Sequence, residues 1–310
     1  SASAVGPKKT GTKKAEVENE ENLEAGNFSP EEIEERVGEV VGAQTVVNLK
    51  SANWKERLEG AEAFLGKVEE MAEGVDPHCE MIIRFLAPLI TPEKNMQVTT
   101  KIIEVVTVTA RNGMSFSRRD AHQSIEPVGV QMASHIRARI PCSTCLSTLC
   151  EAVGAGFVLK HLLPKAAKDK NPKVLSESLT WAATTVEEFG LAGVDVKGIL
   201  KELKEALSSA VAPTRTAATK VLGAMHVYLG AGIKDFLSDV KPALMTSIET
   251  EFQKMPHNPS QTPTRMVRQK KRAAAAAGGG DENAVEVEEE EDAGASGGFG
   301  LPAEDISGKM

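Results

Sequence analysis

Apolar residues recur every three or four positions through most of the chain, which is the period of one face of an α-helix. The pattern begins after Ser29-Pro30-Glu31-Glu32, where serine, proline and glutamate have the spacing of a capping box at a helix start. The run Val105–Thr109 has strand propensity but lies inside the same period, so we expect a helix there. The predicted helices cover 30–49, 54–68, 77–86, 98–110, 117–140, 143–153, 157–167, 175–189, 196–207, 213–229 and 233–252, eleven in all.

Breaks in the pattern divide these helices into pairs. The breaks within pairs fall about 40 residues apart, which is the period of HEAT-type helical repeats. Pairs of this kind stack into a solenoid, because each pair has a face that it cannot bury alone. We therefore predict an all-α HEAT-repeat solenoid of about six pairs, whose short loops within pairs emerge along one edge as a binding surface. The breaks lie at Asn53, Lys94, Pro141, Pro172 and Pro213.

The composition agrees with helix packing and excludes a membrane protein. Aromatic residues make up only 4% of the chain, so small aliphatic side chains must fill the core. The chain contains no stretch of 18 uncharged apolar residues, so no segment is long and apolar enough to span a bilayer. The chain opens without methionine or an apolar signal, and we expect it to be a piece of a longer protein.

Charge is concentrated at the two ends. The segment 281–292 contains eight acidic residues and no base, which equals the whole net charge of −8. We expect three parts: an arm at 1–27, a folded domain at 28–255 and a linker at 256–310, with both arms solvated. The cluster RQKKR fits a bland role, as a solubilising linker or a nuclear-localisation-like patch, as well as it fits a functional contact. The basic residues of the arms are Lys8, Lys9, Lys13, Lys14, Arg265, Arg268, Lys270, Lys271 and Arg272.

No pattern of catalytic residues is present. The chain lacks the phosphate-binding GxxxxGK[ST] and GxGxxG patterns, and it lacks HExxH. Its GxSxG match at 294–298 (GASGG) lies in the glycine-rich linker, without the strand and helix that a nucleophile elbow requires. Cys142, Cys145 and Cys150 lie near His135, but Cys145 and Cys150 point in different directions on one helix. Buried thiols are therefore favoured over zinc. We expect no catalytic residue, no metal and no cofactor.

The loops within pairs carry the candidate binding residues. Trp54 and Lys55 begin a helix directly after a break, while Lys170, Lys173 and Arg215 lie at the first turns of two later helices. Trp54 fits either packing on a neighbouring helix or an exposed anchor, and the cations fit either solvated side chains or contacts to an acidic protein.

These loop sequences resemble those of a known family. SANWKERLEGAEAF (51–64), KNPKVLSESLTWAATTVEEFG (170–190) and PTRTAATKVLGAMHVYLG (213–230) are similar to TOG-domain repeats of the ch-TOG, Stu and Dis microtubule polymerases, most like the third domain of the array. The resemblance implies binding of the αβ-tubulin dimer and the microtubule plus end by the loop edge, in the cytoplasm and on the spindle, beside sister TOG domains in one chain. The contacts it implies are Trp54, Lys55, Asn95, Met96, Gln97, Ser143, Lys170, Lys173 and Arg215. The third loop departs from the family pattern, because RARIPCSTC has no base after Pro141.

Two other functions remain open at this stage. One is a microtubule-stabilising TOG protein of the CLASP type, and the other is a general HEAT scaffold of the phosphatase-subunit or transport-receptor type. In addition, the basic arms are expected to attract the acidic microtubule surface by charge alone, so their deletion should leave the melting temperature of the folded domain unchanged.

Overall fold

The computed structural model describes residue 23 and residues 26–268. The described residues all belong to one compact unit. The described part contains twelve α-helices and three 3₁₀ segments, and no strand. The α-helices are α1 (Pro30–Val41), α2 (Ala43–Leu49), α3 (Trp54–Met71), α4 (Cys79–Ile90), α5 (Met96–Asn112), α6 (Arg118–Met132), α7 (Arg139–Val153), α8 (Ala155–Lys168), α9 (Pro172–Phe189), α10 (Val196–Leu207), α11 (Ala212–Leu229) and α12 (Pro242–Lys254); the 3₁₀ segments are Ala72–His78, Ile136–Ala138 and Gly230–Leu237.

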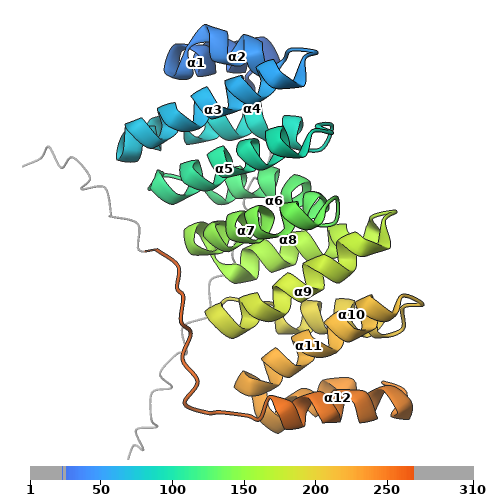
Figure 1. Cartoon of the computed structure of the whole chain (residues 1–310). Helices are drawn as coiled ribbons and strands as arrows, with labels where there is room; N and C mark the ends of the chain where they lie inside the picture. The colour runs from blue at the N-terminus through green and yellow to red at the C-terminus, as the bar shows by residue number, and fades with distance from the viewer. Residues whose placement is uncertain (1–22, 24–25, 269–310) are drawn as a thin grey trace, which may run out of the picture. The chain divides into compact units, whose positions relative to one another are not determined.

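The helices stack in two layers (Figure 1). In one layer, α3 packs on α5, α5 on α7 and α9 on α11, while side chains such as Trp181, which donates to Ser147 Oγ, join α9 to α7. Helices α4, α6, α8 and α10 form the second layer behind them. The end of α12 lies beside the end of α11, where His226 Nδ1 is 2.9 Å from the carbonyl oxygen of Met255. Helix α12 therefore joins the first layer, and the 3₁₀ segment before it completes a sixth pair. The predicted HEAT-type solenoid is confirmed.

The loops within pairs lie on one side of the stack because the helices of the first layer are parallel. They emerge at the right in Figure 1, and we call this side the loop edge. Each loop precedes the first turn of a first-layer helix. The loops are residues 50–53, 91–95, 133–138, 169–171, 208–211 and 238–241.

Several helix boundaries differ from the prediction. Gly42, with φ of 95°, divides the first predicted helix into α1 and α2. The predicted helix 117–140 ends at Met132, and α7 begins at Arg139 rather than Ser143. Pro141 therefore lies in the first turn of α7, where a missing backbone N–H costs no hydrogen bond.

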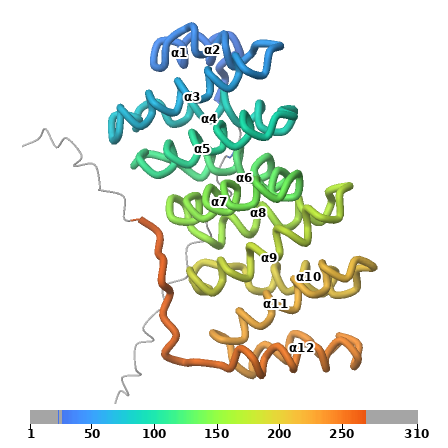
Figure 2. The backbone as a smooth tube through the Cα atoms, viewed as in Figure 1, coloured from blue at the N-terminus to red at the C-terminus, as the bar shows by residue number. Residues whose placement is uncertain are grey.

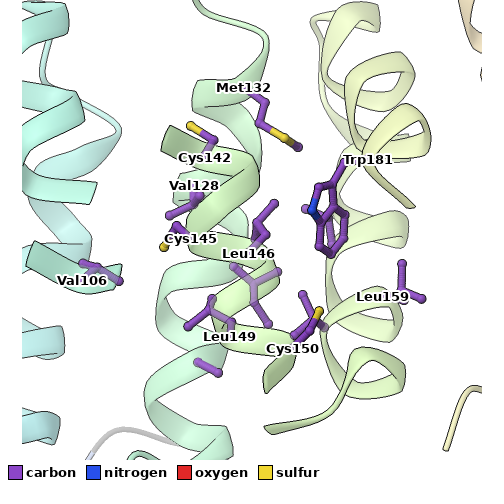
Figure 3. Close-up of a cluster of buried hydrophobic side chains, with 14 of the residues drawn as sticks. Val106, Val128, Met132, Cys142, Cys145, Leu146, Leu149, Cys150, Leu159 and Trp181 are labelled. Atoms are coloured by element: carbon purple, nitrogen blue, oxygen red, sulfur yellow. The ribbon is translucent and has the colours of Figure 1, made fainter. Parts of the chain in front are cut away.

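The core runs through all the repeats, and the cysteines belong to it (Figure 3). Cys142 and Cys145 lie on the side of α7 that faces α5, whereas Cys150 lies on the side of Trp181. Burial raises the pKa of Cys145 to about 12, so the thiol stays protonated near neutral pH. Within the described residues, no group of three or more His, Cys, Asp or Glu side chains is placed to hold a metal ion.

An extended segment returns along the opposite side of the stack (Figure 2). We call residues 256–268 the C-terminal strap. Backbone N–H groups of the strap donate hydrogen bonds to carbonyl oxygens near the ends of three first-layer helices. These bonds run from Asn258 N to Val227 O of α11 (3.0 Å), from Thr264 N to Glu188 O of α9 (2.8 Å) and from Arg268 N to Glu151 O of α7 (2.8 Å).

Side chains of the strap reinforce these contacts. Arg265 forms ion pairs with Glu151 (2.8 Å) and Glu188 (3.0 Å), and Arg268 donates to the carbonyl oxygens of Ala110 and Arg111 at the end of α5. Cations are favoured at helix C-termini, where carbonyl groups lack partners. At Gly190, with φ of 69°, an added Cβ would lie 3.1 Å from Pro263 Cγ, so the glycine permits this close approach. The expectation of a solvated linker from residue 256 is therefore wrong for residues 256–268.

Candidate functional site

The first loop presents an exposed tryptophan. Asn53 caps α3 by accepting a hydrogen bond from the backbone N–H of Lys55 (3.1 Å), which fixes the start of the helix at Trp54. Trp54 is 39% exposed, and Lys55 is exposed without an ion-pair partner among the described residues. The structure thus favours the exposed-anchor interpretation of Trp54 over helix packing.

Arg57, one turn further along α3, ties the first loop to the second. Its Nη1 donates to Ser51 O (2.9 Å) and Ala52 O (3.0 Å), while Nε and Nη2 reach the two carboxylate oxygens of Glu93 (2.6 and 2.9 Å). The Glu93 side chain is only 5% exposed. Burial raises the pKa of Glu93, but hydrogen bonds from Arg57 and from the backbone of Asn95 outweigh it, and the net pKa is lowered. Arg57 is therefore a structural clamp and not a free cation.

The second loop offers one exposed side chain among its three predicted contacts. Asn95 caps α5, and its side-chain oxygen accepts from the backbone N–H groups of Gln97 (2.9 Å) and Val98 (3.4 Å). Met96 is half-buried and packs against the core. Gln97 is exposed and remains the candidate contact of this loop.

The third loop differs from its sequence prediction. Ser143 lies within α7, half-buried, with its hydroxyl 3.9 Å from the sulfur of Met132, so it is not a loop residue. The exposed residues of the loop and of the first turn of α7 are Ser134, His135, Ile136, Arg137, Arg139 and Ile140. Sequence reasoning missed them because it placed the break at Pro141. A proline near the start of a helix is the signal that could have moved the boundary.

The fourth loop presents two lysines. Asn171 caps α9 by accepting from the backbone N–H of Lys173 (3.1 Å), and both Lys170 and Lys173 are exposed without an ion-pair partner among the described residues. Arg139, by contrast, forms an ion pair with Glu177, which links the start of α7 to α9.

The fifth loop is braced by Arg215. Nη1 of this half-buried side chain donates to Ser209 O (2.8 Å) and Ala210 O (3.0 Å). Its Nε and Nη2 atoms have no partner within the described part of the chain, so they can donate hydrogen bonds to a carboxylate of a partner protein. These donors form a planar fork that suits bidentate binding.

Apolar surface also gathers on the loop edge. Among the described residues, seven large hydrophobic side chains are exposed, and four of them belong to the first and third loops or to the helix turns beside them. Exposed apolar side chains at a loop are available for burial by a partner protein. The four are Val47, Trp54, Ile136 and Ile140.

Only some of the basic residues that were predicted to attract the microtubule lattice lie in the described part of the chain. Arg268 is held by helix carbonyls, and burial lowers its pKa, so it is not the solvated cation that we expected. Arg265, the other described base of the arms, is paired with Glu151 and Glu188. The remaining residues of the set lie outside the described residues; they are Lys8, Lys9, Lys13, Lys14, Lys270, Lys271 and Arg272.

A comparison with protein families identifies the domain. The model of the XMAP215/Dis1/CLASP TOG domain matches residues 46–252, which include all the loops described above. The chain belongs to this family. The resemblance to TOG domains drawn from the loop sequences is therefore confirmed, and none of the helices described here is long and apolar enough to cross a membrane.

Relatives and solved structures agree with this assignment. The TOG domain is 36% identical to Protein MOR1 of Arabidopsis thaliana over 285 residues, 90% of this chain and 13% of MOR1. It is 26% identical to Protein mini spindles of Drosophila melanogaster over 247 residues, 78% of this chain and 12% of that protein. The chain thus spans about an eighth of the length of these relatives.

Among solved structures, the third TOG domain of Drosophila melanogaster Mini spindles matches with a TM-score of 0.64 at 25% identity, covering 73% of this chain and 99% of that one. A chain from a structural study of tubulin recruitment by microtubule polymerases with TOG arrays matches with a TM-score of 0.58 at 16% identity, covering 71% and 48%. At that identity the second match shows the fold alone.

Proposed function

We propose that this TOG domain binds the αβ-tubulin dimer through the loop edge, as one module of a longer microtubule polymerase that acts on growing microtubules and the spindle. The observation that carries the proposal is the exposure of Trp54, Lys170, Lys173 and the free donors of Arg215 along one rigid edge. Solved proteins of this fold include TOG arrays described as recruiting and assembling tubulin. The module would hold tubulin without chemistry of its own.

The loop edge is suited to a long, acidic protein surface. Asparagine caps fix the first, second and fourth loops at helix starts, so their side chains are placed before the partner arrives. Such preorganisation lowers the entropic cost of association. The unpaired cations favour a partner with exposed carboxylates.

The edge is also long enough for two subunits. Four repeats separate Trp54 from Arg215, and each repeat advances by about one helix diameter, ~10 Å, so the two contacts lie roughly 40 Å apart. That span would allow Trp54 to contact one tubulin subunit and Arg215 the other.

The two alternatives predict different behaviour. A general HEAT scaffold that binds through its helix faces would tolerate substitution of Trp54. A stabilising protein of the CLASP type would share the loop edge but would slow microtubule growth instead of promoting it. Growth rates of dynamic microtubules, measured with the full-length protein, separate the two TOG functions.

The proposal is tested by size-exclusion chromatography of the domain with purified αβ-tubulin. Wild-type protein should co-elute with tubulin, and Trp54→Ala should elute separately while it keeps its melting temperature. Separate elution of the folded wild-type domain at tens of micromolar would contradict the proposal. The basic residues outside the described part are tested by co-sedimentation with assembled microtubules at low salt. Removing these residues should lower the fraction of protein that binds the microtubules.

A further inference from the structure

The third loop carries the most exposed aliphatic side chains of the loop edge. Ile136 is 71% exposed and Ile140 is 78% exposed. Full burial of an isoleucine side chain contributes about 1.5–3 kcal/mol, so leaving two in water at neighbouring positions forgoes a large part of the available stability.

The loop that presents these side chains is held in place. Ala138, between them, is fully buried, and its backbone N–H donates to His135 O (2.9 Å). The ring nitrogen Nδ1 of His135 accepts from the backbone N–H of Arg137 (3.1 Å). The exposure of the two isoleucines is therefore a property of a fixed turn.

The two isoleucines lie close together along the chain. The backbone is helical through Ala138 and Arg139, so the 3₁₀ segment runs directly into α7. Ile136 and Ile140 are therefore separated by little more than one turn of this backbone. One partner surface can cover both exposed side chains.

Two arginines lie beside the isoleucines, and only one of them is paired with a carboxylate. Arg139 is occupied by Glu177, which is fixed on α9. Arg137 is exposed and has no ion-pair partner among the described residues. A partner that covers the isoleucines would therefore meet one unpaired cation at their border.

We propose that Ile136 and Ile140 form a second hydrophobic anchor for tubulin, at the centre of the loop edge, with Arg137 pairing with a carboxylate of tubulin. This inference rests on the proposed tubulin binding and assigns the third loop a contact different from Ser143. The occupant is an apolar patch of the tubulin dimer bordered by acidic side chains. The third loop lies on the same edge as Trp54 of the first loop and Lys170 of the fourth, so one partner surface would extend over all of them.

The test compares a double substitution with a matched control. Ile136→Ser combined with Ile140→Ser should weaken tubulin binding about tenfold or more in a fluorescence titration, since a central apolar contact is lost. The melting temperature should hardly change, because exposed side chains contribute little to folding. Met266→Ser removes an equally exposed side chain, 75%, from the strap on the opposite side of the stack, and it should bind like wild type.

A second variant tests the loop without changing the isoleucines. Arg137→Glu should also weaken binding, and the loss should shrink at high salt because screening reduces the repulsion. If Arg137→Glu and the isoleucine double variant both bind like wild type while Trp54→Ala does not, the anchor is refuted and the proposed function stands. If all three bind like wild type, the proposed function itself fails.

One further outcome concerns self-association. The isoleucine surface could instead be covered by a second copy of the chain. Sedimentation of the domain alone detects this: a wild-type dimer that becomes monomeric in the double variant, with unchanged tubulin affinity, overturns the proposal. A monomeric wild type that loses tubulin affinity on substitution supports it.

Discussion

Arg57 and Arg215 make the same pair of backbone contacts at opposite ends of the loop edge, but only Arg57 is neutralised by a carboxylate. Each donates Nη1 to the carbonyl oxygens five and six residues before it, at 3.0 and 2.9 Å for Arg57 and at 3.0 and 2.8 Å for Arg215. The remaining nitrogens of Arg57 bind Glu93, whereas those of Arg215 have no partner in the described part of the chain. The Arg57–Glu93 pair therefore shows the geometry in which Arg215 would receive a carboxylate from tubulin.

This difference predicts that alanine substitution of Arg57 mainly lowers the stability of the fold, whereas alanine substitution of Arg215 mainly lowers the affinity for tubulin. Arg57→Ala leaves the Glu93 carboxylate buried and unpaired, which should cost ~3 kcal/mol of unfolding free energy. Arg215→Ala should cost ~1 kcal/mol of stability through its two backbone hydrogen bonds, but ~1–3 kcal/mol of tubulin binding through the charged contact. Denaturant unfolding and a tubulin titration on each variant separate the two quantities.

Arg215→Lys is the control for that comparison. Lysine keeps the charge but lacks the planar fork, so it should restore only part of the binding. An Arg215→Ala variant that loses as much stability as Arg57→Ala and binds in proportion to folded protein would show that Arg215 is purely structural.

The two tryptophans provide a second prediction. Trp54→Ala should weaken tubulin binding by ~2 kcal/mol or more, about 30-fold, and should leave the melting temperature nearly unchanged. Trp181 is only 6% exposed and donates to Ser147 Oγ (3.3 Å), so Trp181→Ala should cost ~3–5 kcal/mol of stability. Calorimetry of both variants checks this; a large fall in melting temperature for Trp54→Ala would place that side chain in the core.

The strap predicts a stability difference between two truncations. Removing residues 256–310 deletes the contacts to α5, α7, α9 and α11, and should cost ~2 kcal/mol, about 4–8 °C for a domain of this size. Removing residues 269–310 deletes none of these contacts and should leave the melting temperature unchanged. This replaces the expectation that loss of both arms is neutral for melting. Equal melting of the two truncations would contradict a stabilising strap.

The Arg57–Glu93 pair also predicts a pH dependence. The net pKa of Glu93 is lowered in the folded protein, so the unfolded state binds this proton more readily. The pair therefore stabilises fully above the unfolded pKa of about 4.3, and this contribution is lost as the pH falls through the lower folded pKa. In urea unfolding between pH 7 and 3, Glu93→Gln should show a shallower loss of stability than wild type. Parallel curves would exclude a role for Glu93.

The sequence predicted the repeat architecture and part of the site. Asn53 before Trp54 and Asn171 before Lys173 mark helix starts locally, because an asparagine cap acts within three residues. The prediction of the third loop was wrong because it placed the break at Pro141. Proline fits equally well at a break and in the first turn of a helix, and only packing decides between the two. Ile136 and Ile140 were consequently counted within a helix.

The strap could not be predicted from local pattern. Its segment 256–264, PHNPSQTPT, lacks apolar periodicity, and its backbone bonds carry no sequence signature. The partners of Arg265 lie 77 and 114 residues earlier in the chain, so the ion pairs become visible only when the repeats are stacked.

The central claim is that the loop edge binds one tubulin dimer at two distant points. Tubulin titrations of Trp54→Ala, Arg215→Ala and the double variant test it most directly, because contacts roughly 40 Å apart share no partners and their losses should add within ~0.5 kcal/mol. We predict two separate losses that sum in the double variant, with wild-type folding in all three. Unchanged affinity in the folded double variant would contradict the claim.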